Sequence, residues 1–307
     1  MSIGWTRDSD KSRLQRYAIP TKLAGGFALS VFGLGTYQMG GGLERDWDND
    51  DGRDIAAIQA AVTAGVTHID TAEIYAGGHC ERLVGRAIAG LDRSRLFIAS
   101  KVYPTHLHFD DVIAACRGSL ERLGISQLDL YLVHMPNPEI PLAETVRAMD
   151  WLVEHEMVRF IGVSNFDLSW LEAARALTKY GIVTNQIHYS LVARAYEDNG
   201  TLEYCRTHGI LVTAYRPIGK FGELARSGHL MLDRISAKYR KTPAQIAVNW
   251  VLSKPNVVAL VKTSRPDHLR DDLGALGWQL QPEDVAELDT KFPRGETINV
   301  PQRPPST

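Results

Sequence analysis

Short apolar runs alternate with longer amphipathic stretches along most of the chain. Each run is rich in Val, Ile, Leu and aromatic residues and is bounded by Gly, Pro or Asn, as is typical of buried β-strands. Eight such runs occur, at residues 31–36, 67–72, 96–102, 128–134, 158–165, 183–189, 210–215 and 257–263. Their alternation with stretches of helical length predicts a parallel sheet whose strands are joined by helices.

The stretches between these runs have the period of amphipathic helices. Apolar residues share one helical face at positions 55, 58 and 62, and another at positions 112, 116, 120 and 123. Gly65 and Gly124 stand where helix C-caps are expected. Thr242, Pro243 and Gln245 suit an N-cap, a first helical position and a capping-box partner. The segment before the last strand is therefore predicted to hold two helices.

Eight regular strand and helix units favour a closed (β/α)8 barrel over an open sheet. No stretch has the composition of an interdomain linker, so residues 1–307 are predicted to form one domain. Outside the barrel we expect a hairpin over 17–30 that turns at Gly25-Gly26 and closes the bottom, a helix over 281–289, and an irregular tail over 290–307. The connection 216–228 is long, and such loops are usually functional or disordered.

Charge and composition narrow the possible partners. The formal net charge is -2, so no overall field would attract nucleic acid or an anionic membrane. The 3 cysteines lie far apart without CxxC spacing, which suits reduced thiols. The N-terminus lacks an apolar signal segment, and no stretch is long and apolar enough to span a bilayer. We expect a soluble cytoplasmic protein.

Polar residues mark the ends of three consecutive predicted strands. Asp70 closes the second run, Lys101 the third and His134 the fourth, and Tyr75 follows in the loop after Asp70. Active sites of parallel barrels lie at the C-terminal ends of the strands. Because neighbouring strands lie about 4.8 Å apart, these side chains should converge within roughly 10 Å. Each residue alone is equally compatible with an ordinary surface or core position, but their coincidence favours an active site.

These residue types suit proton transfer to an oxygen that gains negative charge. A phenol has an ordinary pKa of about 10, and a neighbouring ammonium is expected to lower the pKa of Tyr75 by favouring the phenolate. Asp70 would hold Lys101 charged and oriented. His134 would orient or polarise a carbonyl group, or help to relay the proton.

The chain resembles the aldo-keto reductase family over nearly its whole length. The matching segments are GLGTYQMGG, HIDTAEIY, ASKV, LYLVHMP, IGVSNF, NQIHYS, TAYRP and the KTS segment. The resemblance implies a barrel that binds an extended nicotinamide cofactor without a Rossmann domain, and a catalytic tetrad of Asp70, Tyr75, Lys101 and His134. The implied reaction is NAD(P)H-dependent reduction of an aldehyde or ketone, with Tyr75 as proton donor. The reverse oxidation of an alcohol uses the same groups.

By the same resemblance, Ser164, Asn165 and Gln186 hydrogen-bond the nicotinamide carboxamide, and Tyr215 stacks on the ring. Asn165 or Gln186 alone is also compatible with an ordinary polar residue that finishes a strand. The other residues of the first, second and seventh strand ends assigned to the cofactor are Gly35, Thr36, Tyr37, Asp70, Arg216 and Pro217.

The adenosine end of the cofactor is assigned to residues 260–272. Basic and hydroxyl side chains beside a helix start suit the 2′-phosphate of NADPH, and they are Lys262, Thr263, Ser264 and Arg265. Two positions depart from the common family pattern, because its arginine falls on His268 and its asparagine near the adenine falls on Asp272. We predict NADPH as the cofactor, with NADH as the alternative.

The substrate pocket is predicted to be formed by Tyr37, Tyr103 and Met135. Many relatives carry a tryptophan where this chain has Met135, so the pocket should have a different shape there. Aromatic core packing is the competing interpretation of the two tyrosines. The substrate is left open as a carbonyl or alcohol compound, and the resemblance implies a monomer.

The sequence lacks the complete motifs of three other kinds of site. Gln38 replaces the third glycine of a GxGxxG fingerprint, and Phe166 replaces a glycine of the nucleophile elbow. The histidines and aspartates at 106–111 lack HExxH spacing, so no metal is predicted. Two alternatives stay open, a Schiff-base aldolase that uses Lys101 as nucleophile and a cofactor-binding regulatory barrel without turnover.

Overall fold

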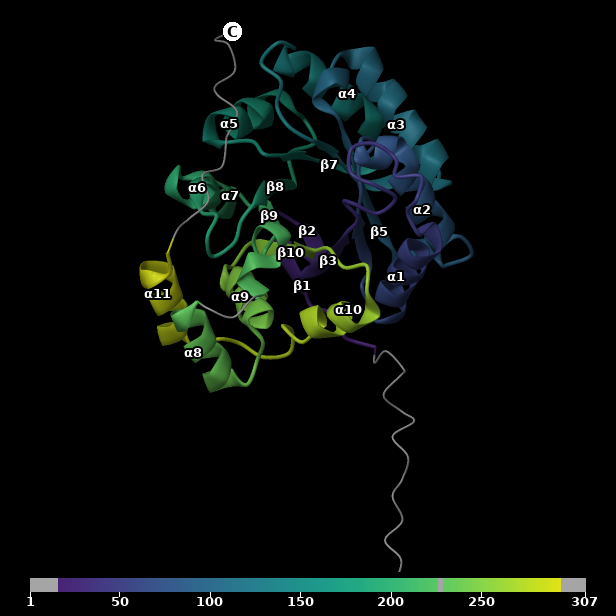
Figure 1. Ribbon diagram of the computed structural model, residues 1–307. Helices are drawn as coiled ribbons and strands as arrows, with labels where there is room; N and C mark the ends of the chain where they lie inside the picture. Colours follow the sequence, from purple (N-terminus) through teal and green to yellow (C-terminus); the bar gives the residue numbers. More distant parts are fainter. Residues whose placement is uncertain (1–15, 226–228, 294–307) are drawn as a thin grey trace, which may run out of the picture.

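The computed structural model describes residues 16–225 and 229–293, and its centre is a closed barrel of parallel strands (Figure 1). The strand order around the barrel is β10-β3-β4-β5-β6-β7-β8-β9. The barrel strands are β3 (Phe32–Gly35), β4 (His68–Asp70), β5 (Phe97–Val102), β6 (Leu128–Val133), β7 (Val158–Ser164), β8 (Thr184–His188), β9 (Leu211–Tyr215) and β10 (Val257–Val261). The predicted (β/α)8 barrel is confirmed. Each predicted strand is one to three residues too long, because the chain leaves the ladder at the barrel rims.

Helices cover the outside of the barrel (Figure 1). They are α1 (Asp51–Thr63), α2 (His79–Ile88), α3 (Phe109–Leu123), α4 (Leu142–Glu154), α5 (Leu168–Leu177), α6 (Ala195–Asp198), α7 (Thr201–Thr207), α8 (Leu230–Tyr239), α9 (Pro243–Ser253) and α10 (Pro266–Leu273). Short 3-10 turns are η1 (Tyr75–Gly78), η2 (Arg93–Arg95), η3 (Pro104–His106) and η4 (Lys220–Ala225). The two helices expected before the last strand are α8 and α9. Thr242 and Gln245 form the predicted capping box of α9.

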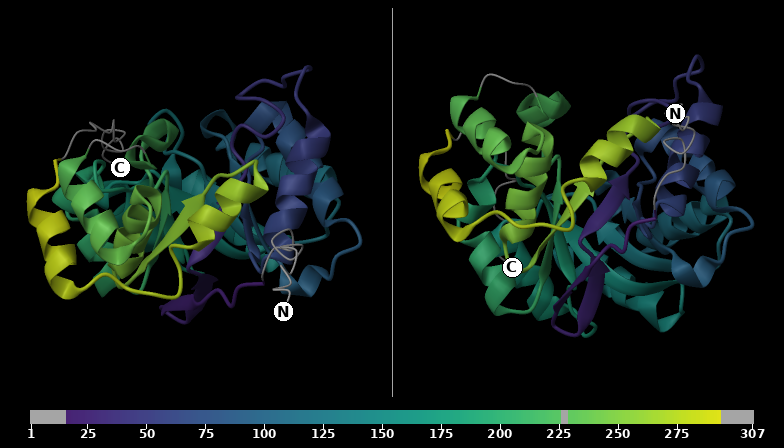
Figure 2. Two further views of the ribbon diagram at one scale, coloured as in Figure 1. Left: turned by 60° about the horizontal axis from the view of Figure 1, so that its bottom comes forward. Right: turned by 90° about the horizontal axis from the view of Figure 1, so that it is seen from below.

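The predicted N-terminal hairpin consists of β1 (Thr21–Ala24) and β2 (Phe27–Ser30), which turn at Gly25 and Gly26. Figure 2 shows it at the opposite end of the barrel from the long loop between β3 and α1. The Phe27 ring packs edge-on against Phe160, with centroids 4.9 Å apart, and lies 5.9 Å from the Phe97 ring. Apolar side chains of the hairpin therefore close the bottom of the barrel.

The C-terminal helix α11 (Pro282–Lys291) is longer than expected. The irregular tail predicted from residue 290 is wrong for its first two positions, because buried Leu288 and Phe292 hold this part of the chain against the body. Arg194 donates hydrogen bonds to the carbonyl oxygens of Leu288 and Asp289, at 2.8 Å and 2.7 Å. The remainder of the tail, 294–307, lies outside the described residues, as do 226–228 of the connection after β9.

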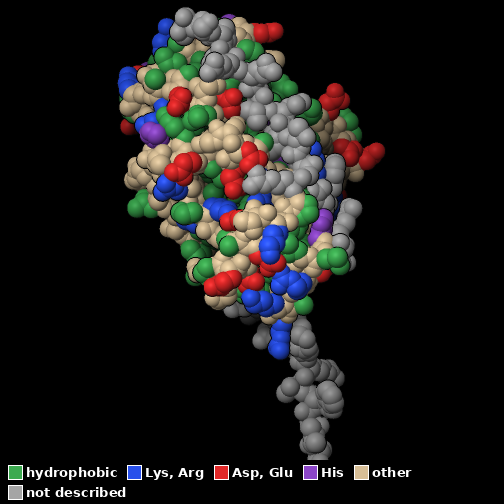
Figure 3. Space-filling model, turned by 90° about the vertical axis from the view of Figure 1, so that its left-hand side faces the viewer, with side chains coloured by type: hydrophobic (Ala, Val, Ile, Leu, Met, Phe, Trp, Pro, Cys, Tyr) green, Lys and Arg blue, Asp and Glu red, His purple; other side chains and the backbone are tan. Residues whose placement is uncertain are grey.

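The surface carries charges of both signs. Acidic and basic side chains intermingle on the face that Figure 3 presents, in keeping with the formal net charge of -2. Within residues 16–225 and 229–293, none of the helices combines the length and the apolar character that crossing a bilayer requires.

Candidate active site

A cavity of about 330 Å³ opens where the C-terminal ends of the barrel strands meet. Residues from all eight barrel strands or the loops that follow them line it, as parallel barrels arrange their active sites. The lining residues are Tyr37, Leu43, Asp70, Ile74, Tyr75, Tyr103, His134, Met135, Ser164, Asn165, Gln186, Tyr215, Arg216, Leu260 and Lys262. The sequence did not identify Leu43 and Ile74 as site residues, and it included Leu260 only within the segment 260–272, because these three apolar side chains have no group that could act in catalysis.

Lys101 is the centre of the buried polar cluster below this cavity. Its Nζ donates to Asp70 Oδ1 at 2.6 Å, to the carbonyl oxygen of Thr71 at 2.8 Å and to the Tyr75 hydroxyl at 3.2 Å. Burial lowers the pKa of Lys101, whereas Asp70 and Tyr75 raise it. Their combined effect is larger than that of burial, so the pKa of Lys101 lies above its ordinary value. Lys101 is therefore an ammonium group whose hydrogen bonds are all directed at oxygen.

The Tyr75 hydroxyl differs from the expectation in one respect. Burial raises the pKa of Tyr75, the positive charge of Lys101 lowers it, and the balance lies above the ordinary value. Lys101 lowers the pKa of Tyr75 as predicted, but loss of hydration outweighs the attraction of one ammonium that Asp70 already neutralises, an effect that the prediction did not include. Tyr75 consequently holds its proton at neutral pH.

His134 lies beside this phenol as a neutral imidazole. The ring centroids of Tyr75 and His134 are 5.7 Å apart with an interplanar angle of 77°. Burial lowers the pKa of His134 to about 3, and the charge of Lys101 acts in the same direction. Its Nδ1 is buried and has no hydrogen-bond partner among the residues that the structure describes. A neutral ring next to a protonated phenol can orient an oxygen atom without competing for the proton.

Acid is expected to destabilise the protein partly through His68 and His134. Burial holds the pKa of His68 at about 4, and His134 lies at about 3, whereas an unfolded histidine titrates near about 6.5. This contribution to stability is complete above about pH 6.5 and is lost as the pH falls, because only the unfolded chain binds the protons. The free energy of unfolding should fall by about 1.4 kcal/mol per pH unit for each histidine.

Urea unfolding between about pH 7 and pH 5 tests this, since both folded pKa values lie below that interval. Carboxylates add their own pH dependence, so the comparison is between wild type and His68→Gln. The variant should show the shallower slope. An equal slope would contradict a buried, neutral His68.

A second polar network joins the residues assigned to the nicotinamide. The Tyr215 hydroxyl donates to Asn165 Oδ1 at 2.9 Å, and Asn165 Nδ2 donates to Ser164 Oγ at 3.0 Å. Ser164 Oγ donates to the carbonyl oxygen of Gln186 at 2.8 Å. Gln186 Nε2 donates to Asp70 Oδ2 at 2.8 Å, which connects this network to Lys101. The amide groups of Asn165 and Gln186 lie on the cavity wall, so they fit the donor and acceptor edge of a carboxamide.

The residues assigned to the adenosine end are only partly brought together. Lys262 lines the cavity, and partial burial lowers its pKa. Arg265 is exposed and pairs with Asp267 at 2.6 Å, while His268 is exposed on the first turn of α10. Asp272 is buried near the end of α10, and burial, with Asp271 adding to it, raises its pKa to about 7.

Several other assigned residues lie behind the cavity wall. The Thr36 side chain is fully buried and donates to the carbonyl oxygen of Asp70 at 2.9 Å, so it supports β4. The Thr263 hydroxyl donates to the carbonyl oxygen of Arg265 at 3.0 Å and shapes the turn before α10. Ser264 in this turn is half-buried, Pro217 is buried and Gly35 is half-buried.

Part of the cavity lining is apolar and aromatic. The predicted Tyr37, Tyr103 and Met135 lie there, together with Leu43 and Ile74. Tyr37 packs edge-on against Tyr75, with ring centroids 5.1 Å apart, and Met135 is partly exposed at the mouth. This wall is therefore placed to contact whatever reaches the Tyr75 hydroxyl.

Comparison with known proteins points to one family. The model of the aldo/keto reductase family matches residues 31–292. Methylglyoxal reductase YeaE of Escherichia coli is 34% identical, over 90% of this chain and 96% of its own. The thermostable aldo-keto reductase Tm1743, solved with the inhibitor epalrestat, is 41% identical with a TM-score of 0.85, covering 89% of this chain and 99% of its own. An aldo/keto reductase from Klebsiella pneumoniae, solved with NADP and acetate, is 36% identical with a TM-score of 0.80, covering 92% and 99%.

Proposed function

Because the chain belongs to the aldo/keto reductase family, we propose that it is an NADPH-dependent reductase that converts an aldehyde or ketone to an alcohol, with Tyr75 as the proton donor. The observation that carries this proposal is the hydrogen bond of 3.2 Å between Lys101 Nζ and the hydroxyl of a protonated Tyr75 at the base of an open cavity. A carbonyl oxygen seated there receives a proton from one side and faces the neutral ring of His134 on the other.

The residues of the chain divide the acid chemistry between them. Tyr75 gives its phenolic proton to the oxygen as negative charge develops on that oxygen. The ammonium of Lys101 stabilises the phenolate that remains, and Asp70 keeps Lys101 charged and aligned. His134 orients the oxygen before transfer. A proton from solvent then restores Tyr75.

The cofactor site is assigned from the donors that line the cavity. NADPH, when bound, supplies the hydride that reduces the carbonyl carbon. Ser164, Asn165 and Gln186 would hold its carboxamide, and Tyr215 would lie against its ring. The Klebsiella relative was solved with NADP, which supports the same class of cofactor here. Lys262, at the start of the turn before α10, would meet the phosphate.

The geometry of Lys101 weighs against a Schiff-base aldolase. A Schiff base forms from a neutral amine, whereas Lys101 is a buried ammonium with a raised pKa that donates hydrogen bonds to three oxygen atoms.

An experiment distinguishes the reductase from a regulatory barrel without turnover. Purified protein should oxidise NADPH when aldehydes are added, with small dicarbonyl compounds included because of the name of the Escherichia coli relative. Tight NADPH binding without oxidation across a broad panel would favour the regulatory barrel.

NADPH should bind more tightly than NADH, and Lys262 should account for much of the difference. Removing a charged hydrogen bond to the 2′-phosphate costs about 1.5–3 kcal/mol, so Lys262→Met should weaken NADPH binding on the order of 10-fold to 100-fold. NADH binding should change less than about twofold, because NADH carries no 2′-phosphate. Titrations that follow tryptophan fluorescence measure both affinities.

Lys179→Met is the matched control, since Lys179 lies after α5 at the opposite end of the barrel and pairs with Glu154. Equal losses of NADPH and NADH affinity in Lys262→Met would remove Lys262 from phosphate recognition.

A further inference from the structure

The chain directly after Tyr75 adopts an unusual backbone conformation. Ala76, Gly77 and Gly78 have φ angles of 51°, 60° and 85°, so three successive residues lie in the left-handed region before α2 begins. Alanine rarely adopts this region, because its Cβ crowds the backbone carbonyl. Contacts from the rest of the protein must therefore impose the turn that carries Tyr75.

One set of contacts comes from the loop between β3 and α1. The backbone N–H groups of Ala76 and Gly77 donate to the carbonyl oxygens of Gly42 and Leu43, each at 2.8 Å. Ala76 is almost fully buried. These bonds fix the turn to the loop that carries Leu43, a residue of the cavity lining.

The other set of contacts comes from Arg122 on α3. A Cβ added at Gly78 would lie 2.8 Å from Arg122 Cδ, and one added at Gly118 would lie 2.9 Å from Arg122 Nη1. The Arg122 side chain thus occupies a slot between two glycines, one in the turn and one in α3. A side chain at either glycine would displace it.

The guanidinium group of Arg122 connects this slot to the strand that carries Lys101. Arg122 Nε donates to Glu81 Oε2 at 2.6 Å, and Glu81 is fully buried although it is an acid. Glu81 Oε1 accepts a hydrogen bond from Ser100 Oγ at 2.5 Å. Ser100 directly precedes Lys101 on β5. A continuous path therefore runs from the turn after Tyr75, through Arg122, Glu81 and Ser100, to the residue that bonds the Tyr75 hydroxyl.

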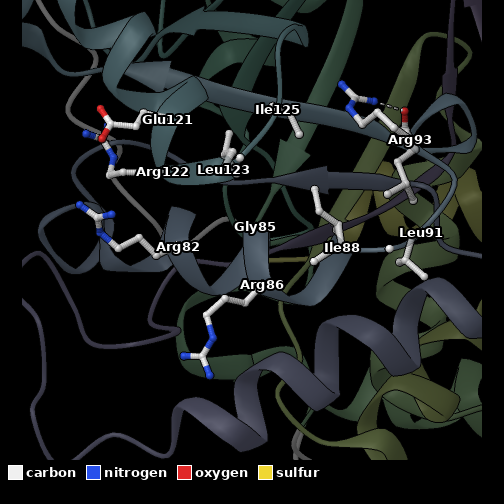
Figure 4. A pocket seen from close by; sticks show the side chains of 14 residues that line it. Arg82, Gly85, Arg86, Ile88, Leu91, Arg93, Glu121, Arg122, Leu123 and Ile125 are labelled. Carbon is white, nitrogen blue, oxygen red and sulfur yellow. Dashed lines mark hydrogen bonds between the residues drawn. The ribbon is translucent and has the colours of Figure 1, made fainter.

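Arg122 also borders a groove of about 570 Å³ between α2 and α3, on the outer surface of the barrel. Arg82, Arg86 and Arg93 line the same groove, and Figure 4 shows the Arg86 side chain extending away from Arg122. The Arg122 side chain is 20% exposed, so solvent reaches this end of the path.

We propose that Arg122 and Glu81 are positioning residues for the proton donor, and that their ion pair holds the turn of Tyr75 in place relative to Lys101 from outside the barrel. This inference rests on the proposed function of Tyr75. Neither residue touches the cavity, so both act through the backbone of η1 and through Ser100. Misplacement of a catalytic group by about 1 Å is enough to reduce turnover on the order of 100-fold.

Arg122→Ala tests the proposal, with Arg86→Ala as a matched control from the same groove. We expect kcat to fall on the order of 10-fold to 100-fold in Arg122→Ala, while the affinity for NADPH stays within about twofold and Arg86→Ala resembles wild type. Methylguanidinium added below denaturing concentrations should restore part of kcat, because the vacated slot opens to the groove. Ser100→Ala removes only the buried hydroxyl that donates to Glu81, and it should also lower kcat.

Hydrogen exchange gives a readout that does not depend on turnover. The amides of Ala76 and Gly77 should exchange faster in Arg122→Ala than in wild type or Arg86→Ala. If wild type oxidises no NADPH with any carbonyl, the proposed function fails, and exchange still decides whether Arg122 holds the turn. Wild-type kcat and wild-type exchange in Arg122→Ala would overturn the inference. If Arg122→Ala does not fold, the same two outcomes in Ser100→Ala decide.

Discussion

Tyr75→Phe should lower kcat on the order of 10²-fold to 10⁴-fold, the range for removal of a general acid. The substitution removes one hydroxyl, whose hydrogen bond is with Lys101 Nζ, and leaves the ring in its contacts with Tyr37 and His134. NADPH affinity should therefore change less than about threefold. Steady-state turnover with an aldehyde and a separate NADPH titration measure the two quantities.

Tyr131→Phe is the matched control, because Tyr131 is fully buried on β6 and its hydroxyl has no partner among the described residues. Tyr131→Phe should keep wild-type turnover.

The pH dependence of wild-type turnover is a second test of the role of Tyr75. Since burial raises the pKa of Tyr75, activity that depends on its proton should persist through neutral pH and decline only under strongly alkaline conditions. Near-normal turnover of Tyr75→Phe would remove Tyr75 from the acid role.

Lys101→Met should abolish most turnover and also destabilise the fold. The variant leaves the Asp70 carboxylate buried without its ammonium, and breaking such a pair from one side costs about 3–5 kcal/mol. It also removes the charge that stabilises the Tyr75 phenolate. Urea unfolding measures the free energy of unfolding, and NADPH oxidation measures kcat.

The double variant Asp70→Asn with Lys101→Met separates the two effects. A neutral pair removes the buried charge, so much of the lost stability should return, whereas turnover should stay low because the ammonium is still absent. Return of turnover with stability would show that Lys101 acts only in folding. Equal instability of the single and double variants would contradict the account of Asp70 as its charge partner.

The barrel could be predicted from the sequence because the patterns that indicate its strands and helices are local and periodic. Eight apolar runs of strand length and the capping box at Thr242 and Gln245 depend on residues close together in the chain. The predicted ends of the helices and strands were less accurate than their order. The helix α11 continues to Lys291 because Leu288 and Phe292 pack against the body, which no pattern within 290–307 could indicate.

The main members of the candidate site could also be anticipated, and for a topological reason. Consecutive parallel strands are neighbours, so Asp70 and Lys101 at adjacent strand ends had to come close, and Asp70 Oδ1 lies 2.6 Å from Lys101 Nζ. The direction of the pKa of Tyr75 could not be anticipated in the same way. The residue types indicated the attraction of Lys101, whereas the larger opposing effect comes from burial.

What the sequence determined by itself is the alternation of strands and helices, and hence which side chains stand at the active end of the barrel, because periodicity and chain order decide both. The tertiary structure alone decided how deeply each group is buried, which atoms it bonds and how its turn is held. Arg122 lies 44 positions beyond Gly78 in the chain, yet their contact is part of the path that supports the turn of Tyr75. Burial and contact depend on all neighbours in space, and no local pattern of residues records them.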